Sequence, residues 1–156
     1  MALFLSSFEK QIDKKGRVSV PPNFRSALSH PHFAGVVAYG SFVHPCIEAC
    51  GMDRMEALSA RIESLDPFSE ARDAFATAIL GGAVQLGFDS EGRIVLPEAL
   101  MVRAGLSASC VFVGKGATFE IWEPGAFAAH DIAARELAKT NRGLLKASPA
   151  VHHGGA

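Results

Sequence analysis

Residues 13–21 read Asp-Lys-Lys-Gly-Arg-Val-Ser-Val-Pro, and residues 89–97 read Asp-Ser-Glu-Gly-Arg-Ile-Val-Leu-Pro. Both stretches follow the pattern D-x-x-G-R-(apolar)-x-(apolar)-P, and the two copies lie at a constant offset of 76 residues (89 − 13). A pattern that recurs at about half the chain length indicates an internal duplication. The sequence therefore predicts two similar halves related by a pseudo-twofold axis, each presenting the same loop.

The repeated pattern predicts a turn, a strand and a short helix in each half. Asp at the first position and Gly at the fourth favour a type I turn, and apolar residues occupy alternate positions after it. We expect the segments on either side of each turn to pair with each other as a hairpin. The prolines that end the strands predict short helices over 22–28 and 97–103, the second of which stops at Gly105.

The rest of the chain predicts a mainly β fold with packed helices, of the α+β class. Further strand pairs are expected at 33–39 with 42–47 and at 110–113 with 118–122, and helices at 53–65, 67–80 and 124–140. Asp53 and Glu56 have the spacing of a capping box, and Phe68, Phe75 and Ile79 fall on one side of the second helix. We expect a first repeat (1–52), a helical connection packed on the repeats (53–82), a second repeat with a C-terminal helix (83–140) and a flexible tail (141–156).

Composition indicates a globular chain whose charges are segregated. Of the 156 residues 49% are hydrophobic and 20% charged, and no apolar run approaches the roughly 20 residues that span a bilayer. The formal net charge is −1, but residues 9–25 carry five Lys/Arg against two Asp/Glu, whereas residues 48–73 carry three Arg against seven. Because a polyanion responds to the local field rather than to the total charge, a nucleic acid is not excluded.

Cysteine usage indicates the compartment. The three cysteines are an odd number without a framework spacing, which favours a reducing environment and argues against structural disulfides. The apolar residues 1–8 lack a basic leader, so a secretory signal is not expected. We therefore expect a cytoplasmic protein.

The basic residues Lys14, Lys15 and Arg17 are the leading functional candidates. Lys and Arg on a turn can neutralise phosphates, and Arg can also bind guanine through two hydrogen bonds in the major groove. The second copy keeps the turn but has Ser90 and Glu91 in place of the lysines. Turn geometry explains Asp13 and Gly16, but it does not require the lysine charges.

Two further arginines have two readings each. Arg93 could contact DNA, or it could pair with Asp89 or Glu91 and hold its own turn. Arg25 extends the basic cluster if the helix after Pro21 faces the same way, although helical arginines are usually solvated surface residues.

The sequence gives no indication of an enzyme, a cofactor or a metal. His44, Cys46 and Cys50 could form a metal site on paper, but structural zinc usually has four ligands at recognisable spacing, and buried apolar cysteines are the better interpretation. His152-His153 is a weaker candidate. Phosphate-loop and nucleophile-elbow signatures are absent from the sequence.

These residues resemble the MraZ family of bacterial transcriptional regulators, which are built from two AbrB-type (SpoVT-AbrB) repeats. The resemblance covers about residues 1–130 and rests on four segments: Asp13 to Arg17 with Pro21, Phe24 and Arg25; Asp89 to Pro97; Phe75 to Gly82; and Phe119 to Trp122. It implies a double-split, swapped-hairpin β-barrel with packed helices, in which two repeats of one chain imitate an AbrB-type dimer.

The resemblance also implies a function. It implies a homo-oligomeric ring that binds short direct repeats of double-stranded DNA in the promoter of the division and cell-wall gene cluster and represses it. Membrane and small-molecule substrate would play no part, and the protein would be nucleoid-associated. Lys15 and Arg17 would be the main DNA contacts, Lys14 and Arg25 supporting ones, and Arg93 a secondary one.

Two departures and two alternatives remain. The pattern of the family is broken at Glu91 and at Met101, which puts a DNA role for the second loop in question. The alternative functions are an AbrB-like antitoxin, although such proteins usually carry a single repeat, and a structural or protein-binding oligomer.

Overall fold

The computed structural model describes residues 3–146, so the His152-His153 pair and most of the expected tail lie outside the described residues. The elements are β1 (Ser7–Gln11), β2 (Arg17–Ser19), α1 (Pro22–Ser26), β3 (Gly35–Gly40), β4 (Ile47–Cys50), α2 (Met52–Glu63), α3 (Glu70–Phe75), the π-helix η1 (Ala76–Leu80), β5 (Val84–Gly87), β6 (Arg93–Val95), α4 (Glu98–Ala104), β7 (Ser109–Gly114), β8 (Phe119–Trp122), α5 (Pro124–Thr140) and the 3-10 helix η2 (Arg142–Leu145). The chain divides into two compact units, Met1–Pro124 and Gly125–Ala156. The first contains all the strands, and the described part of the second consists of α5 and η2.

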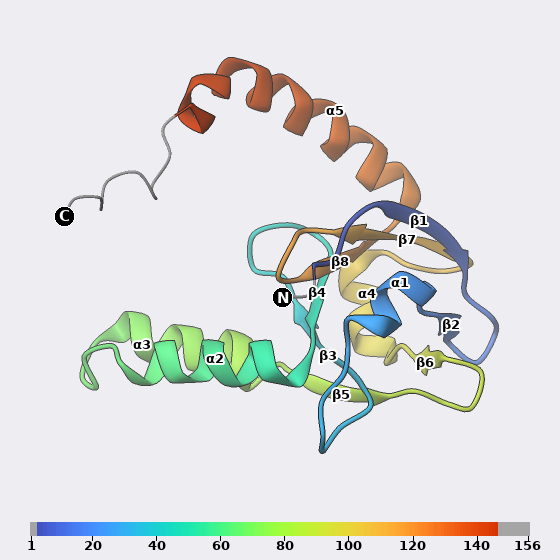
Figure 1. Ribbon diagram of the computed structural model, residues 1–156, viewed down its shortest axis with the longest axis horizontal. Helices are drawn as coiled ribbons and strands as arrows, with labels where there is room; N and C mark the ends of the chain where they lie inside the picture. Colours follow the sequence, from blue (N-terminus) through green and yellow to red (C-terminus); the bar gives the residue numbers. More distant parts are fainter. Residues whose placement is uncertain (1–2, 147–156) are drawn as a thin grey trace. The chain divides into compact units, whose positions relative to one another are not determined.

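The strands form a six-stranded sheet of order β1-β7-β8-β4-β3-β5 and a separate two-stranded ribbon of β2 and β6 (Figure 1). Every pairing is antiparallel. This mixed architecture confirms the predicted α+β class and is consistent with an AbrB-like fold.

The two halves are interleaved rather than side by side. Strands of the first half pair with strands of the second in β1–β7, β2–β6, β3–β5 and β4–β8, whereas β3–β4 and β7–β8 pair within a half. Glu48 lies directly opposite Glu120 in the β4–β8 pair. The predicted duplication is therefore seen in the fold as strands exchanged between equivalent positions.

The expectation that each repeated turn joins two strands of one hairpin is wrong. The strand before each turn joins the large sheet, and the strand after it joins the ribbon. Val18 and Ile94, at the centre of the ribbon, are 1% and 0% exposed. Burial of these side chains in a core shared by both halves outweighs local pairing, because a three-residue strand gains little from a hairpin of its own.

The main core lies between the ribbon and one face of the six-stranded sheet, with Phe24 of α1 at its centre. The Phe24 ring is fully buried and lies 4.9 Å from Phe119, 5.3 Å from Phe4 and 6.2 Å from Phe112, centroid to centroid. Side chains alternate along β3, so Val37 instead packs on the other face of the sheet, against α2 and η1. The sheet therefore has the ribbon over one face and the α2–α3 hairpin over part of the other.

The short helices and the last helix agree with the sequence predictions. α1 and α4 follow Pro21 and Pro97, and α4 stops at Gly105, which has a left-handed φ of +66°. α5 occupies Pro124–Thr140. In the described part of the chain, none of the helices is long and apolar enough to cross a membrane.

The connecting helices depart from prediction at their starts. α2 begins at Met52 after Gly51 and has no side-chain cap. The predicted capping box is wrong, because the Asp53 carboxylate lies inside the first turn and accepts from the N–H of Arg54 at 3.0 Å. α3 starts at Glu70 rather than 67, because the Ser69 hydroxyl accepts from the N–H of Arg72 at 3.1 Å and caps the helix there.

This later start changes the place of Phe68. The residue precedes the helix instead of lying on its packed face, and its side chain is 94% exposed. The helix then continues into the π-helical turn η1, closed by the N–H of Gly81 donating to the carbonyl oxygen of Ala76 at 2.8 Å.

Candidate nucleic-acid interface

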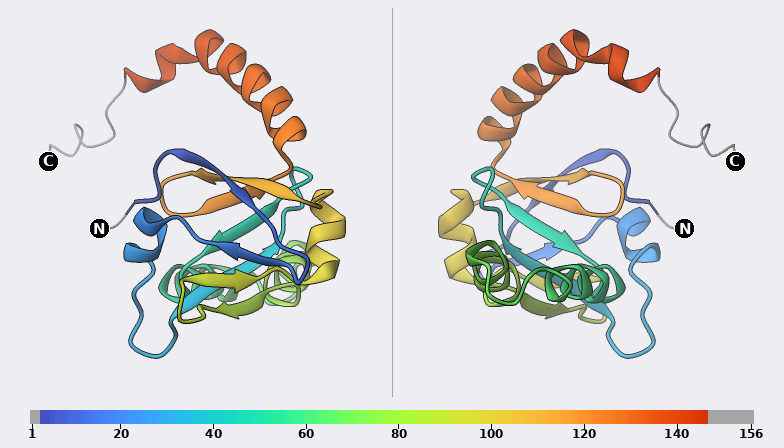
Figure 2. Two further views of the ribbon diagram at one scale, coloured as in Figure 1. Left: turned by 90° about the vertical axis from the view of Figure 1, so that its right-hand side faces the viewer. Right: turned by 90° about the vertical axis from the view of Figure 1, so that its left-hand side faces the viewer.

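The ribbon carries one repeated turn at each end and places the arginines of both turns on its outer face. Arg17 lies opposite Val95, Val18 opposite Ile94, and Ser19 opposite Arg93. Because alternate side chains point to opposite faces and Val18 points into the core, Arg17 and Arg93 share the outer face as diagonal neighbours, with Cα atoms about 7–8 Å apart. The left view of Figure 2 shows β2 and β6 side by side with a turn at either end of the ribbon. A two-stranded ribbon fits the major groove of B-DNA.

Asp13 closes the first turn. Its N–H donates to the carbonyl oxygen of Arg17, and its own carbonyl accepts from the N–H of Gly16, both at 3.0 Å. The Asp13 carboxylate accepts from the N–H of Lys15 and the N–H of Arg17, each at 2.9 Å, and from Nε of Arg17 at 2.6 Å. These hydrogen bonds, chiefly the one from the Arg17 backbone, lower the pKa of Asp13. Gly16 has a φ of +81°, which only glycine adopts without strain.

The second turn repeats this geometry. The Asp89 carboxylate accepts from the N–H of Glu91 and the N–H of Arg93, each at 2.9 Å, and from Nε of Arg93 at 2.8 Å. Gly92 has a φ of +76°. The pKa of Asp89 is lowered, chiefly by the Arg93 backbone, and the Asp89 carboxylate in turn raises the pKa of Arg93. Ser90 and Glu91 therefore build the same turn as two lysines do.

The arginine of each repeated D-x-x-G-R pattern holds its own turn. The pairing considered for Arg93 is observed, both with Asp89 and with Glu91, whose carboxylate lies 3.8 Å from a terminal nitrogen of Arg93. Sequence reasoning missed that Arg17 does the same with Asp13. In each case Nε faces the aspartate. Within residues 3–146, Arg17 has no second acidic partner. Its terminal nitrogens are therefore not paired with a glutamate, unlike those of Arg93.

Each turn is also held by the other half of the chain. The N–H of Leu96 donates to the carbonyl oxygen of Gly16 at 2.8 Å, and the N–H of Val20 donates to that of Gly92 at 3.2 Å. The turns are thus fixed at both ends of the ribbon by equivalent bonds, which makes them rigid supports for whatever their side chains contact.

Arg25 contacts the second turn rather than extending the first. Its Nη1 donates to the carbonyl oxygen of Val20 at 2.6 Å. The guanidinium lies so close to Gly92 that a Cβ on that glycine would stand 2.8 Å from it. The arginine on α1 therefore braces the Gly92 turn, and the equivalent position in the second half is Met101.

The two turns differ in charge, not in backbone. Residues 13–17 carry Lys14, Lys15 and Arg17 against one aspartate, or +2, whereas residues 89–93 carry one arginine against two carboxylates, or −1. Lys14 and Lys15 are exposed, and neither side chain forms an ion pair among the residues that the structure describes. The first turn therefore presents an unneutralised positive end of the ribbon.

The described residues contain no side-chain cluster that fits the metal-site hypothesis. Within residues 3–146, no group of three His, Cys, Asp or Glu side chains is placed to hold a metal ion. Cys46, Cys50 and Cys110 are buried, with exposed fractions of 0–2%. Burial raises the pKa of Cys46 to about 12, helped by the nearby Glu120 and Glu48, and that of Cys50 to about 11. The thiols are therefore protonated core groups.

The fold and the ribbon define an AbrB-like protein in which one chain supplies both interleaved halves. Residues 79–145 match the family described as "MraZ protein, putative antitoxin-like". The chain is 55% identical over 144 residues to "Transcriptional regulator MraZ" of Pelagibacter ubique, an alignment that covers 92% of this chain and 93% of the relative. It is 50% identical to the protein of that name from Rickettsia akari, over 94% of this chain and 98% of the relative. The chain belongs to the MraZ family.

Proposed function

We propose that this protein is a nucleoid-associated, sequence-specific DNA-binding transcriptional regulator, which represses the division and cell-wall gene cluster. In this proposal it binds short direct repeats in the promoter, and the D-K-K-G-R turn of each copy in a homo-oligomeric ring enters the major groove. The shared name of its relatives, transcriptional regulator, supports the regulatory role.

The unequal charge of two equal turns is the observation that carries the proposal. The fold builds the turn equally well with Ser90 and Glu91, so stability does not explain Lys14 and Lys15. Exposed lysines beside a groove-sized ribbon suit phosphate contacts, and the terminal nitrogens of Arg17 suit the two acceptors of a guanine edge. Lys14 and Lys15 would neutralise phosphates, Arg17 would read a base, and Arg25 would act by bracing the turn at Gly92.

Oligomerisation would supply the affinity. A single turn offers few contacts, so one copy alone would bind weakly. Several turns carried by one assembly, facing repeats spaced about one helical turn of roughly 10 bp apart, would bind together through their high effective concentration. The direct-repeat arrangement follows from copies that present the same turn in the same orientation.

The test compares Arg17→Ala with Arg93→Ala in a titration of the DNA upstream of the protein's own gene. The pair is matched, because each change removes the same Asp–Arg contact from the same kind of turn. Any loss through turn geometry should therefore be similar, and the excess loss in Arg17→Ala measures contact with DNA. We expect Arg17→Ala to abolish repeat binding and Arg93→Ala to cost much less.

Equal losses would contradict the assignment of the first turn. If the wild-type protein binds neither that DNA nor an unrelated duplex, the result would favour the antitoxin or protein-binding alternatives. A melting curve for each variant, followed by circular dichroism, is the control for folding.

A further inference from the structure

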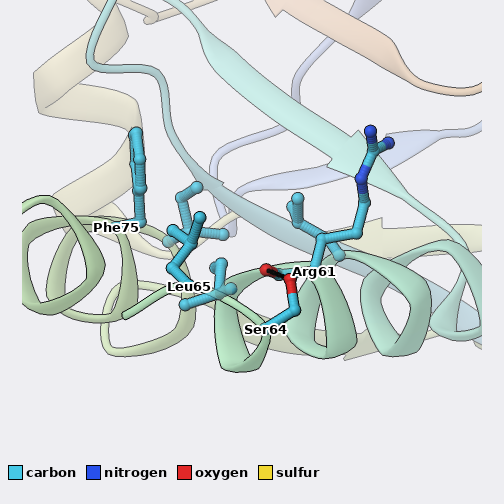
Figure 3. Close-up of a pocket in the computed structure, with 7 residues that line it drawn as sticks. Arg61, Ser64, Leu65 and Phe75 are labelled. Atoms are coloured by element: carbon cyan, nitrogen blue, oxygen red, sulfur yellow. Dashed lines mark hydrogen bonds between the residues drawn. The ribbon is translucent and has the colours of Figure 1, made fainter. Parts of the chain in front are cut away.

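A groove in the α2–α3 hairpin has no assigned occupant. It has a volume of about 410 Å³ and an apolar lining formed by Leu58, Ile62, Leu65, Phe75 and Ile79. Figure 3 shows Phe75 at one end of the groove, Leu65 in the middle and Arg61 at the other end. The hairpin lies away from the ribbon and its turns (Figure 1). Whatever fills the groove therefore leaves the candidate DNA surface accessible.

The rim of this groove is too apolar for an isolated surface. Leu65 is 38% and Phe75 is 37% exposed, and Phe42, 58% exposed, lies with its ring 6.2 Å from that of Phe75. Val43 beside it is 63% exposed. Contiguous exposed apolar patches on soluble domains mark sites of protein association, so the groove with its rim indicates a protein partner rather than solvent.

The loop that joins α2 to α3 carries an aromatic side chain that could fill such an apolar groove. Phe68 is almost fully exposed, yet its backbone is fixed, because its N–H donates to the Asp66 carboxylate at 3.0 Å and the helix cap at Ser69 follows at once. A rigid aromatic residue loses little conformational freedom on binding and is a common anchor of interfaces. Phe68 is thus a preformed knob.

The charges around the knob and the groove are complementary. Exposed acidic residues, Asp66 and Glu70, flank Phe68. Arg61 lines the groove, and among the described residues its guanidinium forms no ion pair, whereas the neighbouring Arg72 pairs with Glu63 at 3.6 Å. One chain therefore carries both parts of a contact, an aromatic knob beside acids and an apolar groove beside a cation.

We propose that Phe68 of one copy of this chain occupies the groove of the next copy, with Arg61 of the groove facing the acidic residues beside the knob. The proposal rests on the homo-oligomer of the proposed function and names its interface. When each copy gives its knob to the next copy and receives the knob of the one before, the contact is heterologous and adds copies head to tail, as a ring requires. Each added copy leaves its own D-K-K-G-R turn (residues 13–17) free on the far side of the compact unit.

The test measures molar mass by light scattering after size exclusion. Phe68→Ala removes the knob, and Leu65→Trp fills the groove from its rim. Val102→Ala, which truncates an apolar side chain that is 73% exposed on α4, is the matched control. We expect wild type and Val102→Ala to be oligomers and both interface variants to be monomers, because loss of an anchor residue weakens a contact by about 30-fold or more.

Mixing the two interface variants gives the sharper result. The Phe68→Ala copy keeps its groove and the Leu65→Trp copy keeps its knob, so we expect one-to-one dimers and no larger species. Dimers in the mixture would also demonstrate that both variants are folded. A mixture that stays monomeric, or a Phe68→Ala protein that keeps the wild-type mass, would overturn the proposal.

A charge exchange tests the polar part of the contact. Arg61→Glu and Glu70→Arg should each weaken assembly, by about fivefold for an exposed ion pair, and the double variant should recover most of the loss. Failure of the double variant to recover would remove Arg61 from the interface. A monomeric wild type would refute the homo-oligomer of the proposed function, whereas an oligomer that tolerates Phe68→Ala would refute this interface alone. DNA binding by the first turn is measured separately with the arginine pair described above.

Discussion

Replacing the first turn by the second is the most informative perturbation that the duplication offers. The double variant Lys14→Ser/Lys15→Glu gives residues 13–17 the sequence of residues 89–93. The same molecule already builds that sequence into the same turn, with aspartate bonds of 2.9 Å to both backbone N–H groups. The folded structure should therefore be unchanged while the charge of the turn falls from +2 to −1.

The size of the effect follows from counterion release. Each phosphate neutralised contributes about 0.9 to the slope of log affinity against log salt, so two lysines contribute about 1.8 per engaged turn. Between about 50 and 200 mM salt, this part of the slope corresponds to a roughly twelvefold loss of wild-type affinity per engaged turn. The variant should lack that loss and should bind more weakly than wild type throughout the range.

The assay is a fluorescence anisotropy titration of labelled upstream DNA at several salt concentrations. The melting curve of the variant should coincide with that of wild type. The reciprocal variant, Ser90→Lys/Glu91→Lys, should steepen the salt dependence only if the second turn also lies against DNA. Equal salt slopes for wild type and the Lys14→Ser/Lys15→Glu variant would refute phosphate neutralisation by these lysines.

Three further predictions concern the frame of the site. Gly16→Ala should lower the free energy of unfolding by ~2–3 kcal/mol, because it combines a left-handed φ with a Cβ 3.0 Å from the Leu96 carbonyl oxygen. Gly105→Ala has a similar φ but open space around it, so it should lower the free energy of unfolding by only ~1 kcal/mol. Equal losses in urea titrations would refute the steric part of this reasoning. The folded pKa of Asp13 lies below its unfolded value of about 3.9, so its contribution to stability is present above that value and is lost as pH falls through the folded pKa. Wild type should accordingly lose more stability than Asp13→Asn as pH falls below about 3.9, and parallel curves would contradict this. The three buried thiols should react with a disulfide reagent at pH 8 only after unfolding, because burial raises each pKa to between about 11 and 12, and a native-state reaction at the rate of a free thiol would be inconsistent with this burial.

The sequence predicted those elements whose signals are local. Asp and Gly at fixed positions predicted both turns, the prolines predicted α1 and α4, and Gly105 predicted the end of α4. The pairing of the strands after the turns was predicted wrongly, because alternation in a three-residue strand says which side chains are buried but not which strand lies beside it. The swapped arrangement was available only from the family resemblance.

The candidate site was predictable in composition but not in contact. Lys14 and Lys15 could be selected because the second copy lacks them, and the structure finds both exposed. The place of Arg25 against Gly92 depends on two segments 67 residues apart (92 − 25) meeting in the folded chain, and its residue type carries no sign of that. Phe68 was misplaced because Pro67 gave an earlier start for the helix, whereas the Ser69 cap starts it three residues after the proline, at Glu70.

The interleaving of the halves has a consequence during synthesis. In the β1–β7 pair, Lys10 lies opposite Cys110, so the first strand to leave the ribosome must wait for a partner 100 residues behind it. At a bacterial rate of about 5–20 residues per second, that delay is roughly 5–20 s, during which the backbone donors and acceptors of residues 7–19 have no sheet to join. During that interval, strands of two nascent chains on one messenger RNA can pair with each other, and this competes with pairing inside each chain. We therefore expect expression of residues 1–82 alone to give aggregates or exchanged dimers rather than a folded half.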